Sequence, residues 1–394
     1  MDILIHKELL GMSTHALLKD SMLKWTDVEE CDFVYGDKHS PKSISPLLKL
    51  FDIEISPLVP ESFRKAMAVC TNNQPPWQLV MPKKLYSKNF KKMISDLIAA
   101  EQVIKKSDYT TVFQHSNSVM SLLKPAALDV DLCNRILKNE DNHIVRAILK
   151  GSEKGFCSIP IYDRVSTKTG RLTIKGGPQV LTLKKEYRSI FKPSSPTAKL
   201  YEIDFSSLEP RVASNIAKRS PGQDVYLSFM EYAGISITRD AAKLAVLCSL
   251  YGAGKYNLQS QLKKQNSDVT ADFLIRKVKE YFQVPGLLAS LKKQAKDSGM
   301  IENYFGRPIV VDDARDSVLV NNYLQSTAVD VSLLGFSEFC SALDGKISPL
   351  FIIHDALFFE AEDNYLGEVQ HYLDSGFSCE GLGSFPLTIT EFKV

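Results

Sequence analysis

Two short apolar runs that each carry an aspartate constrain this chain more than any other feature of its sequence. Residues 201–205 and 351–359 have the β-branched and aromatic composition of strands, with Asp204 and Asp355 set among apolar neighbours. A carboxylate in such surroundings is costly to bury unless it is paired or coordinates a metal ion. An aspartate at a strand end is otherwise most often a turn former or a helix cap, so the interpretation depends on whether the two strands are adjacent.

A pair of carboxylates on adjacent strands suits nucleotidyl transfer. That reaction uses two Mg²⁺ ions about 4 Å apart, which activate a primer 3′-hydroxyl and stabilise the leaving pyrophosphate. Such ions prefer hard oxygen ligands. The two aspartates are therefore a first hypothesis for a catalytic metal site.

The composition fits an ordinary globular chain. With 394 residues, 44% hydrophobic and 24% charged, the chain has room for two or three subdomains around a substantial core. Its formal net charge of +2 does not exclude a nucleic-acid partner, because phosphate binding needs only a local basic groove. The seven scattered cysteines form no CxxC pair, which argues against a zinc site or a disulfide framework and favours a reducing compartment.

The sequence gives no indication of export or of a membrane. It contains no apolar run of about 18 residues, and its N-terminus lacks the basic-then-apolar pattern of a signal peptide. We therefore expect a cytoplasmic protein with no membrane partner.

Periodic patterns predict the main helices and strands. A helix is expected over residues 83–106, where seven lysines stand against only Asp96 and Glu101. It is either a solvated amphipathic helix or one that grips a nucleic-acid duplex. From about residue 150 onward, short strand-like runs alternate with long helical stretches, which predicts an α+β fold with a sheet covered on one face by helices.

A second helix is predicted over residues 239–252, with Thr238 as its N-cap and a glycine at its end. Four side chains spaced four residues apart share one face of it: Arg239, Lys243, Leu247 and Tyr251. The two cations suit the phosphates of a nucleotide, and the apolar and aromatic side chains suit its sugar and base. The alternative is a basic surface stripe on an otherwise buried helix.

Seven ordered segments resemble the motifs of family A DNA polymerases, the family that includes bacterial DNA polymerase I. Residues 204–211 resemble its first motif, DxSxxExR, residues 239–252 its second, and residues 353–355 its third. The second motif ends in LYGAG, which is especially similar to phage replicative polymerases. The other segments are TGRL at 169–172, an RxAF-like stretch at 188–191, NYFGR at 303–307 and NxxxQSTAVD at 321–330.

The resemblance implies a catalytic centre with two Mg²⁺ ions, with Mn²⁺ as an alternative. Asp204 and Asp355 would hold the ions, with the backbone carbonyl of Phe205 as a further ligand. Lys243 would bind the triphosphate, and Lys243 or a nearby group would protonate the pyrophosphate.

The resemblance also implies contacts to dNTPs and to primer-template DNA. Nucleotide contacts would come from Arg239, Lys243, Leu247, Tyr251, Glu209 and Arg188. Glu209 matches the family's sugar gate, which excludes ribonucleotides. Contacts to the primer terminus and minor groove, independent of base sequence, would come from Arg171, Asn321, Gln325 and His354.

The fold implied is the right-hand polymerase fold, with an antiparallel palm sheet, helical fingers and a helical thumb. We expect an N-terminal region including the thumb at 1–160, palm at 161–211, fingers at 212–300, and a second part of the palm at 301–394. Residues 51–54 resemble the DxE of a first exonuclease motif, but no second or third motif follows, which favours an acidic strand end. Proofreading or processivity would then come from a separate subunit.

The sequence departs from the family pattern at three places. Leu247 replaces an aromatic ring, Ala356 replaces an acidic residue after the third-motif aspartate, and residues 177–181 differ from PNLQN, so that Gln179 is a weak match for a minor-groove contact. Altered fidelity is expected from these changes. Two alternatives remain open: a single-subunit RNA polymerase-like enzyme, against which Glu209 argues, and a non-catalytic subunit that binds primer-template DNA in a replisome. The compact size and LYGAG are compatible with a phage protein in its host's cytoplasm.

Overall fold

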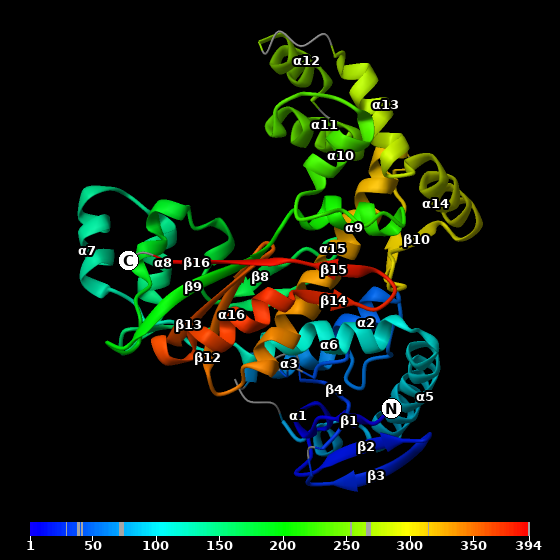
Figure 1. Ribbon diagram of the computed structural model, residues 1–394. Coiled ribbons are helices and arrows are strands. Elements are labelled where there is room, and N and C mark those ends of the chain that lie inside the picture. Colours follow the sequence, from blue (N-terminus) through cyan, green and yellow to red (C-terminus); the bar gives the residue numbers. More distant parts are fainter. Residues whose placement is uncertain are drawn as a thin grey trace. The chain divides into compact units, whose positions relative to one another are not determined.

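The computed structural model describes residues 1–28, 30–37, 40, 42–70, 75–252, 254–264, 269–313 and 315–392. The chain divides into two compact units, Met1–Thr111 and Val112–Val394, which are described separately (Figure 1). Ala253, the fourth residue of the LYGAG segment, lies outside the described residues.

In its described residues, the first unit contains a four-stranded sheet and five helices. Its strands are β1 (Ile3–Ile5), β2 (His15–Lys19), β3 (Met22–Thr26) and β4 (Phe33–Tyr35), in the order β3-β2-β1-β4. β1 runs antiparallel to β2 and parallel to β4. The helices are α1 (Lys7–Leu10), α2 (Ser45–Leu50), α3 (Glu61–Cys70), α4 (Trp77–Val80) and α5 (Lys83–Lys106).

α5 confirms the helix predicted from its lysine-rich pattern, with the same bounds. Its buried side chains recur every three to four residues along one face: Tyr86, Met93, Leu97, Ala100, Glu101 and Ile104. Five of its lysines are exposed and have no ion-pair partner within the described ranges: Lys83, Lys84, Lys88, Lys91 and Lys106.

Residues 51–54 are not a strand, so the prediction of an acidic strand end there is wrong. They follow α2, whose C-cap is Phe51, and Asp52 adopts a left-handed backbone with a φ of 53°. A carboxylate in this turn lacks the strand setting that the resemblance to a nuclease motif requires.

The second unit is a mixed α/β unit that begins within α6 (Tyr109–Leu122). Its remaining helices are α7 (Val130–Asn139), α8 (His143–Lys150), α9 (Leu208–Ile216), α10 (Val225–Ala233), α11 (Arg239–Tyr251), α12 (Lys255–Lys264), α13 (Ala271–Tyr281), α14 (Val284–Ser298), α15 (Asp316–Ala342) and α16 (Leu366–Ser375). Short 3₁₀ turns are η1 (Val180–Thr182), η2 (Lys185–Ile190) and η3 (Asp363–Tyr365).

The central sheet of this unit has the order β12-β13-β9-β16, and every neighbouring pair is antiparallel. Its strands are β9 (Ala198–Phe205), β12 (Ile347–Ile353), β13 (Ala356–Glu362) and β16 (Leu387–Glu391). The described part of this unit also holds four two-stranded hairpins: β5 (Ser152–Glu153) with β6 (Phe156–Cys157), β7 (Ile161–Asp163) with β8 (Thr173–Gly176), β10 (Met300–Glu302) with β11 (Pro308–Val310), and β14 (Phe377–Cys379) with β15 (Gly383–Phe385).

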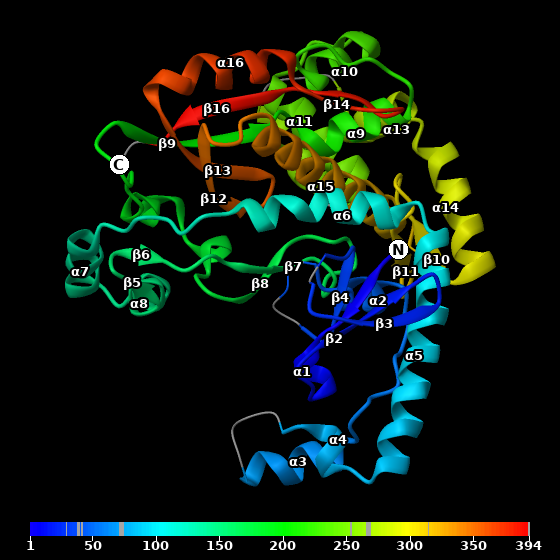
Figure 2. The same cartoon turned by 90° about the horizontal axis from the view of Figure 1, so that it is seen from below.

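Helices cover one face of the central sheet. The Phe205 ring packs 5.4 Å from that of Phe336 on α15, and the Phe359 ring packs 5.3 Å from that of Phe339 on the same helix. Phe339 also contacts Tyr372 of α16, and both helices lie beside the sheet in Figure 2.

The opposite face is also partly covered, whereas the sequence predicted cover on one face only. At β12 and β13 this face packs against α7, α8, η1 and η2 in a second apolar cluster, where the Phe191 and Phe351 rings lie 4.7 Å apart. Because side chains alternate along a strand, Glu202 and Asp204 lie on this second face.

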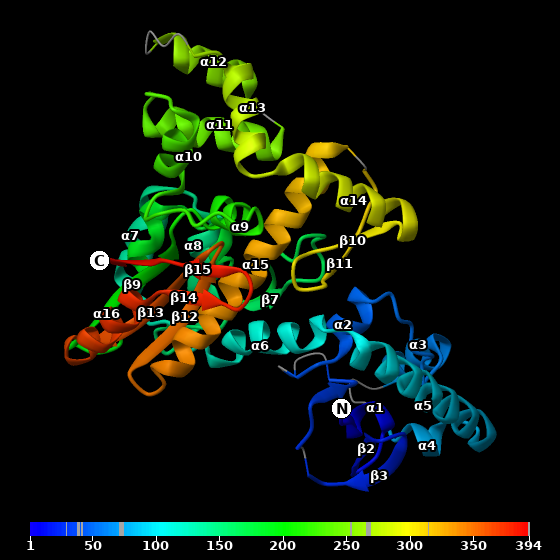
Figure 3. The same cartoon turned by 45° about the vertical axis from the view of Figure 1, so that its right-hand side comes forward.

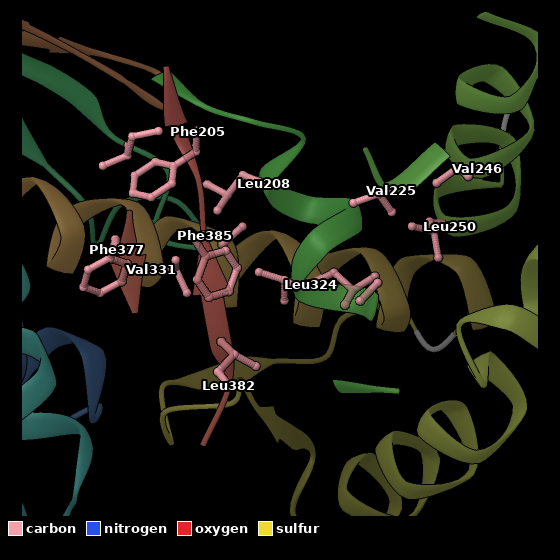
Figure 4. Close-up of a cluster of buried hydrophobic side chains, with 14 of the residues drawn as sticks. Phe205, Leu208, Val225, Val246, Leu250, Leu324, Val331, Phe377, Leu382 and Phe385 are labelled. Carbon is pink, nitrogen blue, oxygen red and sulfur yellow. The ribbon is translucent and has the colours of Figure 1, made fainter. Parts of the chain in front are cut away.

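Helices α10 to α13 pack on one another as a helical lobe (Figure 3). α11 begins at Arg239 and ends at Tyr251, with the Thr238 side chain as N-cap and Gly252 in the left-handed conformation after it. These bounds and both caps confirm the prediction. Figure 4 shows the core continuing from Phe205 on β9 and Phe377 on β14 to Val246 and Leu250 on α11.

None of the helices within the described ranges combines the length and the apolar content needed to cross a lipid bilayer.

Candidate active site

The two aspartates meet at the end of adjacent strands. Ala356, the first residue of β13, lies opposite Asp204 of β9 in the ladder. Asp355 immediately precedes Ala356, in a two-residue turn that joins β12 to β13. The run 351–359 is therefore a hairpin and not one strand, because His354, with a φ of 57°, reverses the chain there.

The electrostatics of Asp204 fit a cation ligand. Burial, together with the carboxylates of Asp355 and Glu202, raises the pKa of Asp204 to about 7. Its Oδ1 is buried and has no hydrogen-bond partner within the described residues. A divalent cation would supply both the missing partner and the missing positive charge.

The carboxylates that could hold such a cation are few. No group of three or more His, Cys, Asp or Glu side chains with metal-binding geometry is found in the described part of the chain. The protein would therefore contribute Asp204 and Asp355, and backbone oxygens or a substrate would supply the other ligands. Phe205 follows Asp204 directly and is the last residue of β9. Its backbone carbonyl, the further metal ligand that the resemblance implies, is therefore adjacent to Asp204 in the chain.

Glu209 joins two of the predicted residues. Its Oε1 accepts a hydrogen bond from Nη2 of Arg171 at 3.1 Å, and its Oε2 accepts one from the hydroxyl of Tyr251. Burial raises the pKa of Glu209, with Arg171 opposing and Asp355 reinforcing this shift. Glu209 therefore links α11 to the TGRL segment beside the aspartates.

The DNA-binding candidates partly cluster. The amide of Gln325 is satisfied when its nitrogen donates to Thr169 Oγ1 at 2.7 Å and its oxygen accepts from the guanidinium of Arg171, 3.2 Å away. Asn321, one helical turn earlier on α15, has a buried Oδ1 without a partner among the described residues. His354 is exposed in the hairpin turn beside Asp355.

Arg239 contacts two residues that the sequence did not indicate, Asp224 and Tyr226. Its Nε donates to Oδ2 of Asp224 at 2.6 Å, and its guanidinium lies 5.0 Å from the centroid of the Tyr226 ring. Asp224 raises the pKa of Arg239. Burial opposes ionisation of Asp224, but Arg239 and the N–H groups of α10 outweigh it and lower the pKa of Asp224.

The other nucleotide-binding candidates lie as follows. Lys243 is exposed on α11, one turn after Arg239, and Leu247 and Tyr251 are partly buried further along the same helix. Arg188 is on η2, where its guanidinium lies 5.3 Å from the Phe358 ring centre and 3.9 Å from the Glu202 carboxylate. It therefore borders the second face of the sheet, on which Asp204 lies.

Asp224 and Arg211 are the residues that sequence reasoning missed. Asp224 stands directly before an apolar run, and this pattern indicates a helix N-cap. Its pairing with Arg239 joins residues on either side of a loop, and no local pattern indicates such a contact. Arg211 is the last residue of the first motif, and the motif alone does not indicate what its side chain contacts. It is buried, and its guanidinium donates to backbone carbonyls.

The fold and site define an α+β protein with an aspartate pair at the hairpin edge of an antiparallel sheet and a basic helix beside it. The model of the DNA polymerase family A matches residues 83–389. The chain belongs to this family, which confirms the predicted polymerase-type architecture with its antiparallel palm sheet.

Two relatives illustrate the similarity. DNA polymerase I of Rhizobium leguminosarum is 25% identical over 316 residues, which are 69% of this chain and 30% of that protein. The chain thus matches less than a third of the length of this curated relative. The polymerase domain of Pol1 from M. smegmatis, solved in complex with DNA primer-template and dNTP, aligns with a TM-score of 0.48 and 16% identity over 78% of this chain and 54% of that chain.

Proposed function

We propose that this chain is a template-directed DNA polymerase that extends a primer 3′-hydroxyl with dNTPs. The observation that carries the proposal is the register that sets Ala356 opposite Asp204, because it brings Asp204 and Asp355 together. Family membership supports the same function.

Asp204 and Asp355 would hold two Mg²⁺ ions, which when bound lower the pKa of the primer hydroxyl and stabilise the charge on the leaving pyrophosphate. The chain's own residues have other tasks. Arg239 and Lys243, one helical turn apart on α11, bind the triphosphate, and Lys243 donates a proton to the leaving pyrophosphate. The primer hydroxyl loses its proton to solvent, and its oxygen forms a bond to the α-phosphorus as the bond to pyrophosphate breaks.

Glu209 favours deoxyribonucleotides. Its carboxylate is fixed from two sides by Arg171 and Tyr251, so it cannot easily move aside for a 2′-hydroxyl. Arg171 and Gln325 form the neighbouring surface for the primer terminus and minor groove. Asn321, one turn earlier on α15, and His354, beside Asp355, would add contacts to the DNA. Arg188 supports the nucleotide side of the sheet through Glu202.

The lysine-rich face of α5 binds the phosphate backbone of the duplex. A second statement of the proposal is that this chain has no 3′–5′ exonuclease activity of its own. The second statement is supported by the turn conformation of residues 51–54. Proofreading and processivity would come from separate subunits.

A primer-extension assay tests the proposal. A 5′-labelled primer on a longer template is incubated with Mg²⁺ and either dNTPs or rNTPs, and also without nucleotides. We expect extension with dNTPs, little extension with rNTPs, and an intact primer in the third reaction. Equal extension with rNTPs would favour the RNA polymerase alternative, no extension would favour the non-catalytic subunit, and a shortened primer would show a nuclease.

A further inference from the structure

Asp224 bonds in two directions, and each of its oxygens has a separate role. Oδ1 accepts from the backbone N–H groups of Tyr226 at 2.8 Å and Leu227 at 3.1 Å, which caps α10. Oδ2 accepts from Nε of Arg239 at 2.6 Å. One carboxylate therefore ties the start of α10 to the first residue of α11.

The contact with Asp224 occupies only one edge of the Arg239 guanidinium. Within the described residues, Nε is the one guanidinium atom that makes a hydrogen bond or ion pair. The Tyr226 ring lies under the group, and the side chain is 48% exposed. The two terminal nitrogens thus form an available fork, whose geometry matches two oxygens of a phosphate.

The loop that carries Asp224 is itself held by a buried arginine. Arg211, on α9, is 3% exposed. Its Nη2 donates to the carbonyl of Gln223 at 2.9 Å, and its Nη1 donates to that of Gly222 at 3.2 Å. Its Nε lies 3.5 Å from the carbonyl of Ser206, just past the end of β9. Arg211 therefore fixes the loop before Asp224 relative to the strand that bears Asp204.

We propose that Asp224 is a positioning residue for the triphosphate: it holds Arg239 by Nε, so that the terminal nitrogens face the phosphates, and Arg211 fixes the loop that presents it. This inference rests on the proposed function and adds a residue to it. A carboxylate that sequestered Arg239 would bind the terminal fork instead, and its removal would strengthen nucleotide binding.

Asp224→Asn isolates the contact to Arg239. An asparagine has a single side-chain oxygen, which keeps the α10 cap, and its amide nitrogen cannot accept from Nε. The matched control is Asp129→Asn, because Asp129 caps α7 by accepting from Leu132 at 2.8 Å and, among the residues that the structure describes, pairs with no arginine. Circular dichroism and thermal melting of each variant establish that it folds.

Two readouts are taken for each variant. The first is KM for dNTP against kcat in primer extension. The second is the Kd of dATP for the protein bound to a dideoxy-terminated primer on a template thymine, which does not require turnover. We expect Asp224→Asn to raise KM and Kd about tenfold, the equivalent of one hydrogen bond to a charged group, with kcat within about twofold. Asp129→Asn should change neither constant.

A double-mutant cycle with Arg239→Ala shows whether Asp224 acts through the arginine. We expect the effect of Asp224→Asn on Kd to disappear in the Arg239→Ala background. An unchanged or lowered Kd in Asp224→Asn, or an equal loss with and without Arg239, would overturn the inference.

The two proposals fail in different ways. If the unmodified protein extends primers, but Asp224→Asn binds dATP with the same Kd as the unmodified protein, the role of Asp224 is refuted and the polymerase function stands. If the unmodified protein binds dATP but does not extend the primer, the function fails, and the cycle on Kd still decides the role of Asp224.

Discussion

Glu209 is the residue on which the contacts of this site converge. Arg171 reaches it from the TGRL segment, and Tyr251 reaches it from the end of α11. In the proposed function, this carboxylate, held by two donors, would be a rigid boundary for the sugar of the incoming nucleotide. Under the same proposal, rigidity would matter because Leu247, which stands where the family has an aromatic ring, would supply no stacking surface for the sugar.

We predict that Glu209→Ala increases the use of ribonucleotides. Removing the carboxylate opens the space beside the 2′ position, so the ratio of kcat/KM for rNTP to that for dNTP should rise at least about tenfold. Tyr251→Phe keeps the carboxylate and removes one of its donors, and it should give a smaller increase. Single-nucleotide incorporation kinetics measure both ratios; an unchanged ratio in Glu209→Ala would refute the sugar-gate role.

At the scale of elements, a buried polar network joins α15 to the β10–β11 hairpin. Asp330 is fully buried, pairs with the guanidinium of Arg164 and accepts from Nδ2 of Asn303 at 2.6 Å. The guanidinium of Arg307, also buried, donates to the carbonyl of Arg164 at 2.8 Å. Arg164, at the centre of this network, precedes the TGRL segment by a few residues. The network therefore supports the placement of Arg171.

We predict that Asp330→Asn strongly destabilises the second unit. The change leaves a buried guanidinium without its counter-charge, which costs about 3–5 kcal/mol of unfolding free energy. The matched control is Asp312→Asn, because Asp312 pairs with Lys168 in a pair that is at least half exposed and should lose less than about 1 kcal/mol. Urea unfolding monitored by fluorescence measures both; similar losses would contradict the buried-pair argument.

Many of the helices and strands could be predicted from the sequence, because the patterns that indicate them are local. The periodicity of α5 and the caps of α11 are encoded within a few residues of each helix end. The hairpin at residues 351–359 could not be recognised as easily. Its turn, His354-Asp355, lacks the Asn-Gly type of signal and is flanked by apolar residues on both sides.

The candidate site was predictable in its residue types but not in its contacts. The motifs indicated Asp204, Asp355, Glu209 and Arg239, whereas pairings across loops have no local pattern. Asp224 with Arg239 is one such pairing, and Gln325 with Arg171 is another. The cover on the second face of the sheet was missed for the same reason, since it comes from residues distant in sequence.

At the scale of the whole molecule, the net charge of +2 conceals a local basic surface on α5. We predict that replacing Lys84, Lys88 and Lys91 together by glutamine weakens primer-template binding. The slope of log K against log salt should fall in magnitude by roughly 2–3, because each lost phosphate contact removes about 0.9. Fluorescence anisotropy across a salt series measures this slope.

The control for this prediction is Lys65→Gln on α3, an exposed lysine that pairs with Glu61 at 2.8 Å. It should leave both the affinity and the slope unchanged. A triple variant with the slope of the unmodified protein would show that α5 is only a solvated amphipathic helix, the alternative that its sequence left open.

The most direct test of two-metal catalysis by this chain is Asp355→Asn in primer extension, with DNA affinity measured in parallel. Asp355 is exposed in a hairpin turn, so the substitution should leave the fold intact. We predict that the extension rate with Mg²⁺ falls by roughly a thousandfold, since metal-bound carboxylates support several kcal/mol of transition-state stabilisation, while the Kd for primer-template stays within about twofold. Extension at the unmodified rate would contradict the assignment of Asp355 and, with it, the proposed reaction.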